Sequence, residues 1–455
     1  MIGTMTLETA ATPHAAGAGW PKRSYAWYVV TLLTLAYALA ILDRVSIGLL
    51  IVPIQAALHI NDTQFGLLQG LAFSLFYSLL GLPLGMVCDK SRRVPLLIAG
   101  LVLWSFATIS CAFAGSFGHL FIARMLVGIG EAALVPCAAS LIADYFEPGI
   151  RPKAYGTFTT GSTLGSVAAF ALSALFLVVA AQLIAGGGPF SDMQSWQIVF
   201  ILCGLPGIAL AIVMAFTMRE PRRQGPIVAA TGISLKPIVA LFRRYPRALL
   251  CLILGTVLNL VCVYAVIGWF PALFIRVHGW SASETGYMLA AVGLPISLFA
   301  ALNSGWVIVW LTKHGHVDAP MIAAMVTGLS MAIFGTLSSV APSAWLSLLF
   351  YAINSLFVNW NISSVYSGLS LIVPNDLRGQ IMALHNIASG LIALTLGSFI
   401  VGLLSDTVFD YAGGVAWSLG VLFVVCGLGG AAVLAYGRPA FRAAASDQQQ
   451  RAAAL

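Results

Sequence analysis

Four charged residues lie inside long apolar segments of this sequence, where burying a charge costs free energy. Asp43 and Arg44 are adjacent in an apolar run over 27–50, and Arg124 and Glu131 lie seven residues apart in a run over 119–142. Seven residues of an α-helix make nearly two full turns, so Arg124 and Glu131 face the same neighbour. Adjacent helical residues diverge by about 100°, so only one of Asp43 and Arg44 can face a central cavity.

The chemistry open to these residues is the handling of protons and anions. A charge at the centre of a bilayer costs at least ~2.5 kcal/mol, so it needs a partner or a wet cavity. Burial disfavours an ionised carboxyl, and a nearby Arg reverses that preference. A movable Arg or an anionic substrate would therefore decide whether Asp43 or Glu131 holds a proton. Arg44, with its planar fork, suits a carboxylate or phosphate. Structural ion pairs that only fix helix packing are the alternative.

The elements that must position these charges are membrane-spanning helices. Of the 455 residues, 60% are hydrophobic and only 8% are charged, against about 25% in soluble domains. A spanning helix needs about 20 apolar residues, and the fold class predicted is an all-α membrane protein with twelve transmembrane helices in two six-helix bundles. The predicted helices cover 27–50, 64–87, 94–116, 119–142, 153–184, 196–218, 248–275, 284–311, 319–341, 344–373, 378–404 and 415–437.

The connections divide the chain and orient it. We expect an N-terminal tail (1–24) without fixed structure, bundles over 25–218 and 248–437, a central loop over 219–247 and a C-terminal tail over 438–455 that is unstructured after Arg442. Nineteen of the 22 Lys and Arg lie at the termini or in even-numbered loops. This places both termini in the cytoplasm, with the protein in the cell inner (plasma) membrane. Arg276 is the one cation in an odd-numbered loop.

Several functions are excluded by what the sequence lacks. The net charge of +7 comes from cations scattered between apolar runs, so no nucleic-acid partner is expected. The seven cysteines form no C-x-x-C and no metal-ligand spacing. No nucleophile-base set or phosphate loop appears, so an enzyme, a metal site and a cofactor are not expected. The expected partners are a small-molecule or lipid substrate and membrane lipids, and the expected state is a monomer.

Further polar residues within the helices extend the candidate site. Asn and His are costly against lipid, so those in the C-terminal half should face the interior, although interhelical hydrogen bonding explains each equally well. Small residues at four-residue spacing from Gly156 to Gly165 favour close helix packing over ligand binding. The predicted substrate-binding residues are Arg44, Arg124, Tyr37, Asn359, Trp360, Asn361 and His385, and Asp43 and Glu131 are the predicted proton-coupling pair.

A short basic segment after the second predicted helix is a candidate conformational gate. It runs Gly85-Met86-Val87-Cys88-Asp89-Lys90-Ser91-Arg92-Arg93, and its predicted gating residues are Gly85, Asp89, Lys90 and Arg93. Asp89 is placed to meet a helix N-terminus or a loop Arg across the interface between the halves. A solvated turn that only sets topology is the alternative. The equivalent segment of the second half, 305–316, lacks the acidic residue.

These motifs resemble the major facilitator superfamily. The match rests on Gly85-x-x-x-Asp89-Lys90-x-x-Arg93 and on Arg124-x-x-x-Gly128-x-Gly130-Glu131-Ala132. Leu42-Asp43-Arg44, Ile142-Ala143-Asp144-Tyr145-Phe146 and Trp269-Phe270-Pro271 resemble its Spinster-like branch. The resemblance implies alternating access by two rocking bundles, with Asp43, Arg44, Arg124 and Glu131 in coupling and head-group binding. Helix 5 has Gly161-Ser162 where many antiporters have Gly-Pro, which argues against antiport.

The resemblance leaves the substrate open among three functions. Spinster-like members are associated with lysophospholipids and sphingosine phosphate, so a proton-coupled transporter of an amphipathic anion is the main prediction. The alternative is a proton-coupled symporter of small organic anions such as carboxylates and sugar acids, whose branch also carries a Leu-Asp-Arg-like helix 1. The third is a sensor that binds its ligand without turnover. Both transport functions need Arg44 for an anion.

Overall fold

The computed structural model describes residues 20–224, 235–411 and 413–453, apart from a few side chains within them. Over these residues the chain is helical without strands, and eleven helical segments are long and apolar enough to cross a membrane. The twelfth predicted span is α15 (Ala344–Ile372), which has the length but carries many Asn and Ser side chains. The predicted all-α membrane fold is confirmed.

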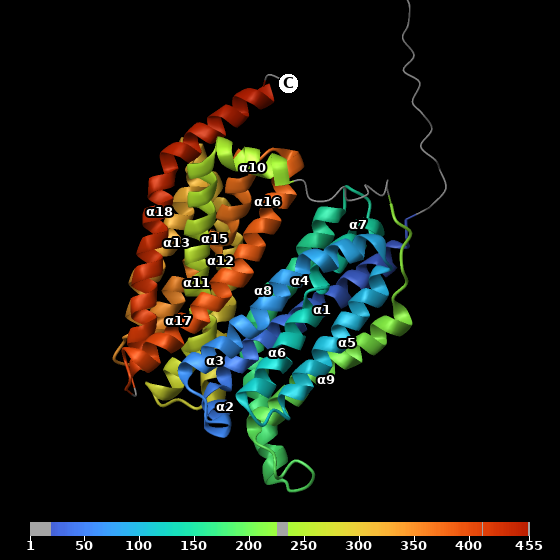
Figure 1. Cartoon of the computed structure of the whole chain (residues 1–455), viewed down its shortest axis with the longest axis vertical. Helices are drawn as coiled ribbons and strands as arrows, with labels where there is room; N and C mark the ends of the chain where they lie inside the picture. Colours follow the sequence, from blue (N-terminus) through green and yellow to red (C-terminus); the bar gives the residue numbers. More distant parts are fainter. Residues whose placement is uncertain (1–19, 225–234, 412, 454–455) are drawn as a thin grey trace, which may run out of the picture.

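The helices form two bundles (Figure 1). The N-terminal half contains α1 (Arg23–Leu49), α2 (Ile51–Leu58), α3 (Asp62–Gln69), α4 (Leu71–Lys90), α5 (Arg93–Cys111), α6 (Phe117–Glu131), α7 (Leu134–Tyr145), α8 (Arg151–Ala185) and α9 (Ser195–Thr217). The C-terminal half contains α10 (Leu235–Arg244), α11 (Pro246–Arg276), α12 (Ala282–Lys313), α13 (Ala319–Ser330), the π-helix η1 (Met331–Gly335), α14 (Thr336–Ser339), α15, α16 (Asn375–Ala388), the π-helix η2 (Ser389–Ala393), α17 (Leu394–Thr407) and α18 (Gly414–Ala453).

The two ends of the molecule differ in how the halves meet. The tail end carries the start of α1, the helix α10 and the last turns of α18, whereas the opposite end, named here the sealed end, carries α2 and α3 against α17 (Figure 1). Among the described residues, hydrogen bonds and ion pairs between the halves extend only from the sealed end, at Asp62 and Arg276, to Ser74 and Thr395. The halves are therefore joined at the sealed end and apart at the tail end.

Several predicted helices are interrupted at positions that matter for the site. The second predicted helix is divided at Gly70 into α3 and α4, and the fourth is divided directly after Glu131 into α6 and α7. π-Turns interrupt the ninth and eleventh predicted helices, and such insertions are frequent at functional sites. Each interruption changes the direction of side chains along a helix that the sequence pattern treats as continuous.

Besides α2, which follows the first predicted helix, two longer segments outside the predicted spans are helical. The central loop contains α10, whose Ile238 and Leu241 are buried against the C-terminal half. The predicted unstructured C-terminal tail is wrong through residue 453, because α18 continues beyond the apolar run. Phe441, in that extension, is fully buried in the same cluster. Most of the N-terminal tail, 1–19, lies outside the described residues.

Candidate functional site

The four charges form two ion pairs, and each pair joins α1 to α6. Arg44 donates from Nε to Glu131 Oε2 at 2.7 Å, with its terminal nitrogen at 2.5 Å from the same oxygen. Asp43 Oδ2 lies 3.4 Å from Arg124. The Arg44 side chain is 22% exposed and the other three are almost fully buried. As predicted, the adjacent residues of α1 diverge, and Arg44 is the one with access to solvent.

Aromatic rings hold the Arg44 guanidinium in place. Its central carbon lies 4.5 Å from the ring centre of Phe73 and 4.5 Å from that of Tyr77, both on α4. A planar guanidinium stacks on such rings, which favour cations at this distance. Tyr37, a predicted binding residue two turns from Arg44 on α1, stacks instead on Phe158 of α8 at 5.0 Å. The cation is thus oriented by α4 and neutralised by α6.

Both ion pairs are incompletely hydrogen-bonded. Within the described residues, Asp43 Oδ1, Glu131 Oε1 and Arg124 Nε are buried and have no hydrogen-bond partner. A buried polar atom without a partner loses about 1–3 kcal/mol of hydration that nothing replaces. A site that served packing alone would gain from satisfying these atoms. The free carboxylate oxygens are the positions at which a proton could be bound.

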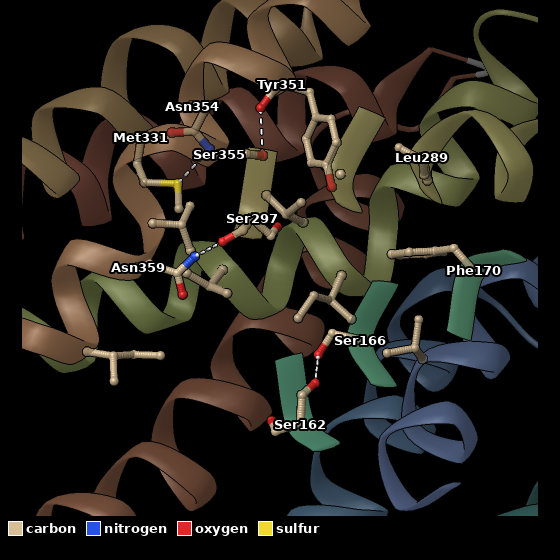
Figure 2. Close-up of a pocket in the computed structure, with 17 residues that line it drawn as sticks. Ser162, Ser166, Phe170, Leu289, Ser297, Met331, Tyr351, Asn354, Ser355 and Asn359 are labelled. Carbon is tan, nitrogen blue, oxygen red and sulfur yellow. Dashed lines mark hydrogen bonds between the residues drawn. The ribbon is translucent and has the colours of Figure 1, made fainter. Parts of the chain in front are cut away.

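A cavity of about 220 Å³ lies between the halves next to this cluster. From the N-terminal half it is lined by Val45, which follows Arg44, and by residues of α8, while α11, α12, η1 and α15 supply the other wall. Figure 2 shows hydroxyl and amide groups on both walls, those of Ser162, Ser166, Ser297, Asn354 and Asn359 among them. Phe170, Leu289 and Met331 add apolar surface. None of the described residues that line it is charged.

The seams on either side of the cavity are closed toward the sealed end. On one side, a Cβ built on Gly286 of α12 would lie 2.7 Å from the carbonyl oxygen of Phe170 in α8, so only glycine allows this approach. On the other, Ser74 of α4 hydrogen-bonds Thr395 of α17 at 2.7 Å. The cavity is therefore bounded laterally by helix contacts at this depth.

The sealed end is held by residues that the sequence reasoning did not assign to a site. Arg276 at the end of α11 donates to both oxygens of Asp62 at 2.9 Å, and to Gln55. In return, Asp406 of α17 accepts from the backbone amides of Asp62 and Thr63 at the start of α3. One signal was present in the sequence, because Arg276 is the one cation in an odd-numbered loop.

The predicted binding residues of the C-terminal half divide into two groups. Asn359 lines the cavity. The indole of Trp360 donates to Asn303 at 2.8 Å. Asn361 is fully buried and bonds Asn259 and the Thr256 carbonyl.

His385 also lies within the bundle. Its Nε2 is 3.2 Å from the Thr256 hydroxyl and its Nδ1 is 3.3 Å from that of Ser389. Trp360, Asn361 and His385 therefore make interhelical hydrogen bonds and do not line the described cavity, which is the alternative recognised from the sequence.

The predicted gate lies at the tail end, where Arg93 is completely buried in a network of the N-terminal half. It donates to Glu220 at 2.7 Å and contacts Asp144. Burial alone would raise the pKa of Glu220, but hydrogen bonds from the Val94 amide and from Arg93 outweigh it and hold that pKa below its usual range. In this conformation Arg93 therefore braces one half, and its side-chain hydrogen bonds within the described chain all go to residues 140–221.

The other predicted gating residues are less constrained. Lys90 is the exposed last residue of α4, and Gly85 lies in the same helix with room for a Cβ, 3.9 Å from Pro136. The side chain of Asp89 lies outside the described part of the structure. In the described chain, no three His, Cys, Asp or Glu side chains are grouped as metal ligands.

Comparison with known proteins places this architecture in a family. Residues 33–394 match the Major Facilitator Superfamily. An MFS-type efflux pump of Mycolicibacterium smegmatis is 24% identical over 92% of each chain. A D-galactonate transporter of Escherichia coli is 25% identical over 85% of this chain and 90% of its own, and a probable L-galactonate transporter of that species is 24% identical over 89% and 87%.

The fold also matches a solved structure. A bacterial homolog to the human lysosomal transporter Spinster, in an inward-facing and occupied conformation, superposes with a TM-score of 0.78. It is 24% identical and the match covers 94% of this chain and 98% of the homolog. The predicted Spinster-like resemblance is thus confirmed in the fold. Two helical bundles joined at one end, paired intramembrane charges beside a central cavity and the match over residues 33–394 lead to one conclusion: the chain belongs to the Major Facilitator Superfamily and is a secondary transporter.

Proposed function

We propose that the chain is a proton-coupled symporter of small organic anions of the sugar-acid class. The observation that carries this proposal is the Arg44 guanidinium, which is partly exposed, belongs to the residue before the cavity-lining Val45 and has its charge balanced by one oxygen of Glu131. A carboxylate is the group that a planar guanidinium binds with two parallel hydrogen bonds. Relatives named as galactonate transporters support a sugar acid over the amphipathic anion predicted first.

The cavity lining supports a hydroxylated substrate. Serine hydroxyls and asparagine amides can both donate and accept hydrogen bonds, so they suit the hydroxyl groups of a sugar acid. The lining groups come from α8, α12 and α15, while the cation comes from α1. The lateral contacts at Gly286 and Ser74 also favour a substrate that enters from the aqueous end over one that enters from lipid.

Competition for Arg44 would couple the substrate to a proton. When a substrate carboxylate takes the guanidinium, Glu131 loses its cation in a buried site, where the ionised form is disfavoured. Glu131 then binds a proton, and substrate and proton are carried together. Asp43 could bind and release a proton in the same way in the second ion pair, where its cation is Arg124 at 3.4 Å.

The same proposal includes the orientation. Nineteen of the 22 Lys and Arg belong to the tail-end side of the predicted topology, and the tail end is therefore placed in the cytoplasm of the inner (plasma) membrane. The separation of the halves at the tail end then makes this an inward-facing state. The transporter acts as a monomer, because each half finds its partner within the same chain.

Flux in proteoliposomes tests the proposal. The wild type should accumulate D-galactonate when the outside is acidic, and Arg44→Ala should abolish both this flux and the thermal shift produced by D-galactonate. Glu131→Gln should exchange substrate but lose the response to the pH gradient. Glu147→Gln is the matched control, because Glu147 is an exposed tail-end carboxylate. Equal gradient-driven flux in Glu131→Gln and the wild type would sink the coupling role.

A second candidate, transport of an amphipathic anion, is favoured by the apolar part of the cavity. Phe170, Leu289 and Met331 could contact an acyl chain while Arg44 holds the head group. The same assay with lysophosphatidate decides between them. Flux of lysophosphatidate without flux of any sugar acid would reverse the order of the two candidates. Binding without measurable flux of either would favour the sensor.

A further inference from the structure

Gln69, the last residue of α3, carries a buried amide that has no hydrogen bonds to the described residues in this conformation, in which the sealed end is closed. Its side chain is part of a residue only 5% exposed, and both Oε1 and Nε2 lack a partner among the described residues. An amide has two donors and an acceptor oxygen with two lone pairs, so all of this capacity is unused. A leucine would fill the position without that loss, which means that the amide serves a different state.

The position of Gln69 is the seam between the halves. A Cβ built on Gly268 of α11 would lie 2.3 Å from Gln69 Oε1, and one built on Gly48 of α1 would lie 3.4 Å from Nε2. The amide therefore lies flat against a backbone of the opposite half, in a socket that two glycines leave open. This socket exists only while the sealed end is closed, and alternating access must separate its walls.

Separation would turn the amide toward the substrate. Gln69 lies four residues before Phe73, at the end of α3 and next to the break at Gly70, and Phe73 of α4 lies 4.5 Å from the Arg44 guanidinium. The residue therefore stands one turn nearer the sealed end than the proposed carboxylate site. No other contact of the described chain uses its amide.

We propose that Gln69 is a substrate-contact residue of the outward-facing state, in which its amide bonds a hydroxyl of a polyhydroxy acid held by Arg44. This rests on the proposed function and narrows its substrate class. An amide matches a hydroxyl because both donate and accept, whereas an acyl chain at this position would leave it unpaired. In the inward-facing state this contact is absent, so the affinity for the substrate is lower there and release is easier.

A double-mutant cycle between protein and substrate tests the contact. Uptake KM from outside is measured for D-galactonate and its monodeoxy analogues with the wild type, Gln69→Leu and the exposed-glutamine control Gln182→Leu. Gln69→Leu should raise the KM for D-galactonate roughly three- to tenfold, the effect of one neutral hydrogen bond. With the wild type, one monodeoxy analogue should have a KM raised by a similar factor over that of D-galactonate. With Gln69→Leu, removal of the same hydroxyl should cause no further rise in KM. Independent, multiplicative losses for every analogue would overturn the contact.

The cycle also separates the contact from a role in gating alone. If Leu only stabilises the closed seam, the KM for all analogues rises by one common factor, which cancels in the cycle and counts against the proposal. Gln182→Leu should leave every KM unchanged, since Gln182 is exposed near the end of α8.

Thiol labelling tests the exposure without requiring transport. All seven native cysteines are buried, so a membrane-impermeant maleimide added outside should react with the Gln69→Cys variant, and D-galactonate should slow that reaction. Absence of labelling would refute the inference even if sugar-acid transport is found. Labelling in a protein that carries no sugar acid would refute the proposed function and the substrate contact, while confirming that the position opens to the outside.

Discussion

Gly402 allows a test of whether the sealed end controls the conformational equilibrium. The residue lies in α17, and a Cβ built on it would be 2.3 Å from the carbonyl oxygen of Asp62 and 3.0 Å from the Thr63 nitrogen. These are backbone atoms of α3 in the other half, so no side-chain rotation can relieve the clash. Gly402→Ala can be accommodated only if α3 and α17 move apart, which is the direction of opening.

The size of the effect follows from the cost of overpacking. Extra methylene groups in a packed region cost about 1–3 kcal/mol, and the outward-facing state escapes that cost because the two helices separate there. A bias of this size changes the ratio of outward- to inward-facing molecules by about 5- to 150-fold. An equilibrium near balance in the wild type would become strongly outward-facing.

Pulsed EPR between spin labels at Lys153 and Lys313 measures the shift. Both residues are exposed at the tail end, one in each half, on the facing helices α8 and α12. Gly402→Ala should shorten this distance relative to the wild type. The matched control is Gly427→Ala, whose Cβ would lie 2.5 Å from the Gly328 carbonyl oxygen of the same half. It should lower the melting temperature without changing the distance.

The reasoning would be refuted by an unchanged distance in Gly402→Ala at a lowered melting temperature. That result would mean that the clash is absorbed within α3 and α17 and is not released by opening. An equal shortening in Gly427→Ala would show that strain anywhere closes the tail end.

Three further changes test other contacts. Arg44→Lys keeps the charge but loses the planar stack and the paired contact with Glu131, so flux should fall at least tenfold with little change in melting temperature. Asp406→Ala removes the acceptor for the first amides of α3, at a cost of about 1–3 kcal/mol to the sealed state, and should shorten the same tail-end EPR distance. Burial alone would raise the pKa of Asp318, but Arg442 and Arg438 outweigh burial and lower that pKa. The ion pair therefore stabilises the folded protein fully at pH values above the unfolded pKa of about 4, and this stabilisation is lost as the pH falls through the lower folded pKa. The melting-temperature difference between the wild type and Asp318→Asn should therefore be constant from pH 8 to 5 and should shrink below pH 4.

The spans and the charge cluster were predictable because both follow from the cost of polar groups in hydrocarbon. That cost makes apolar runs of about 20 residues visible, and it makes Asp43, Arg44, Arg124 and Glu131 conspicuous within them. The pairing was not predictable, because Arg44 selects Glu131 and Arg124 selects Asp43 only through the rotation of α1 against α6. The periodicity of a sequence shows which face of a helix a side chain lies on, whereas its ion-pair partner depends on how the neighbouring helix is placed.

The cavity lining was harder to predict for a related reason. Serine and asparagine in a spanning helix satisfy themselves equally well against a neighbouring helix or a substrate. Asn359 faces the cavity and Asn361, two residues later on α15, is fully buried in helix contacts. The two roles can be told apart only when the rotation of α15 about its axis, and so the face it turns to the cavity, is known. Its low hydrophobicity was a usable signal, since α15 is the one predicted span that falls outside the eleven strongly apolar ones.

The two halves share a brace that the sequence comparison of their loops does not reveal. In the N-terminal half, Arg93 begins α5 and binds Glu220 beyond the end of α9. In the C-terminal half, Asp318 precedes α13 and binds Arg438 and Arg442 in the extension of α18. The third and sixth membrane helices of each half are thus tied by a buried charge, with the signs exchanged. A motif search requires identical residues and finds one copy, whereas the mechanical requirement is an ion pair of either polarity. This explains why the residues after Arg438 continue as a helix: Arg442 is one turn further along α18 and reaches the same carboxylate oxygen, so the ion pair needs helical structure beyond the membrane.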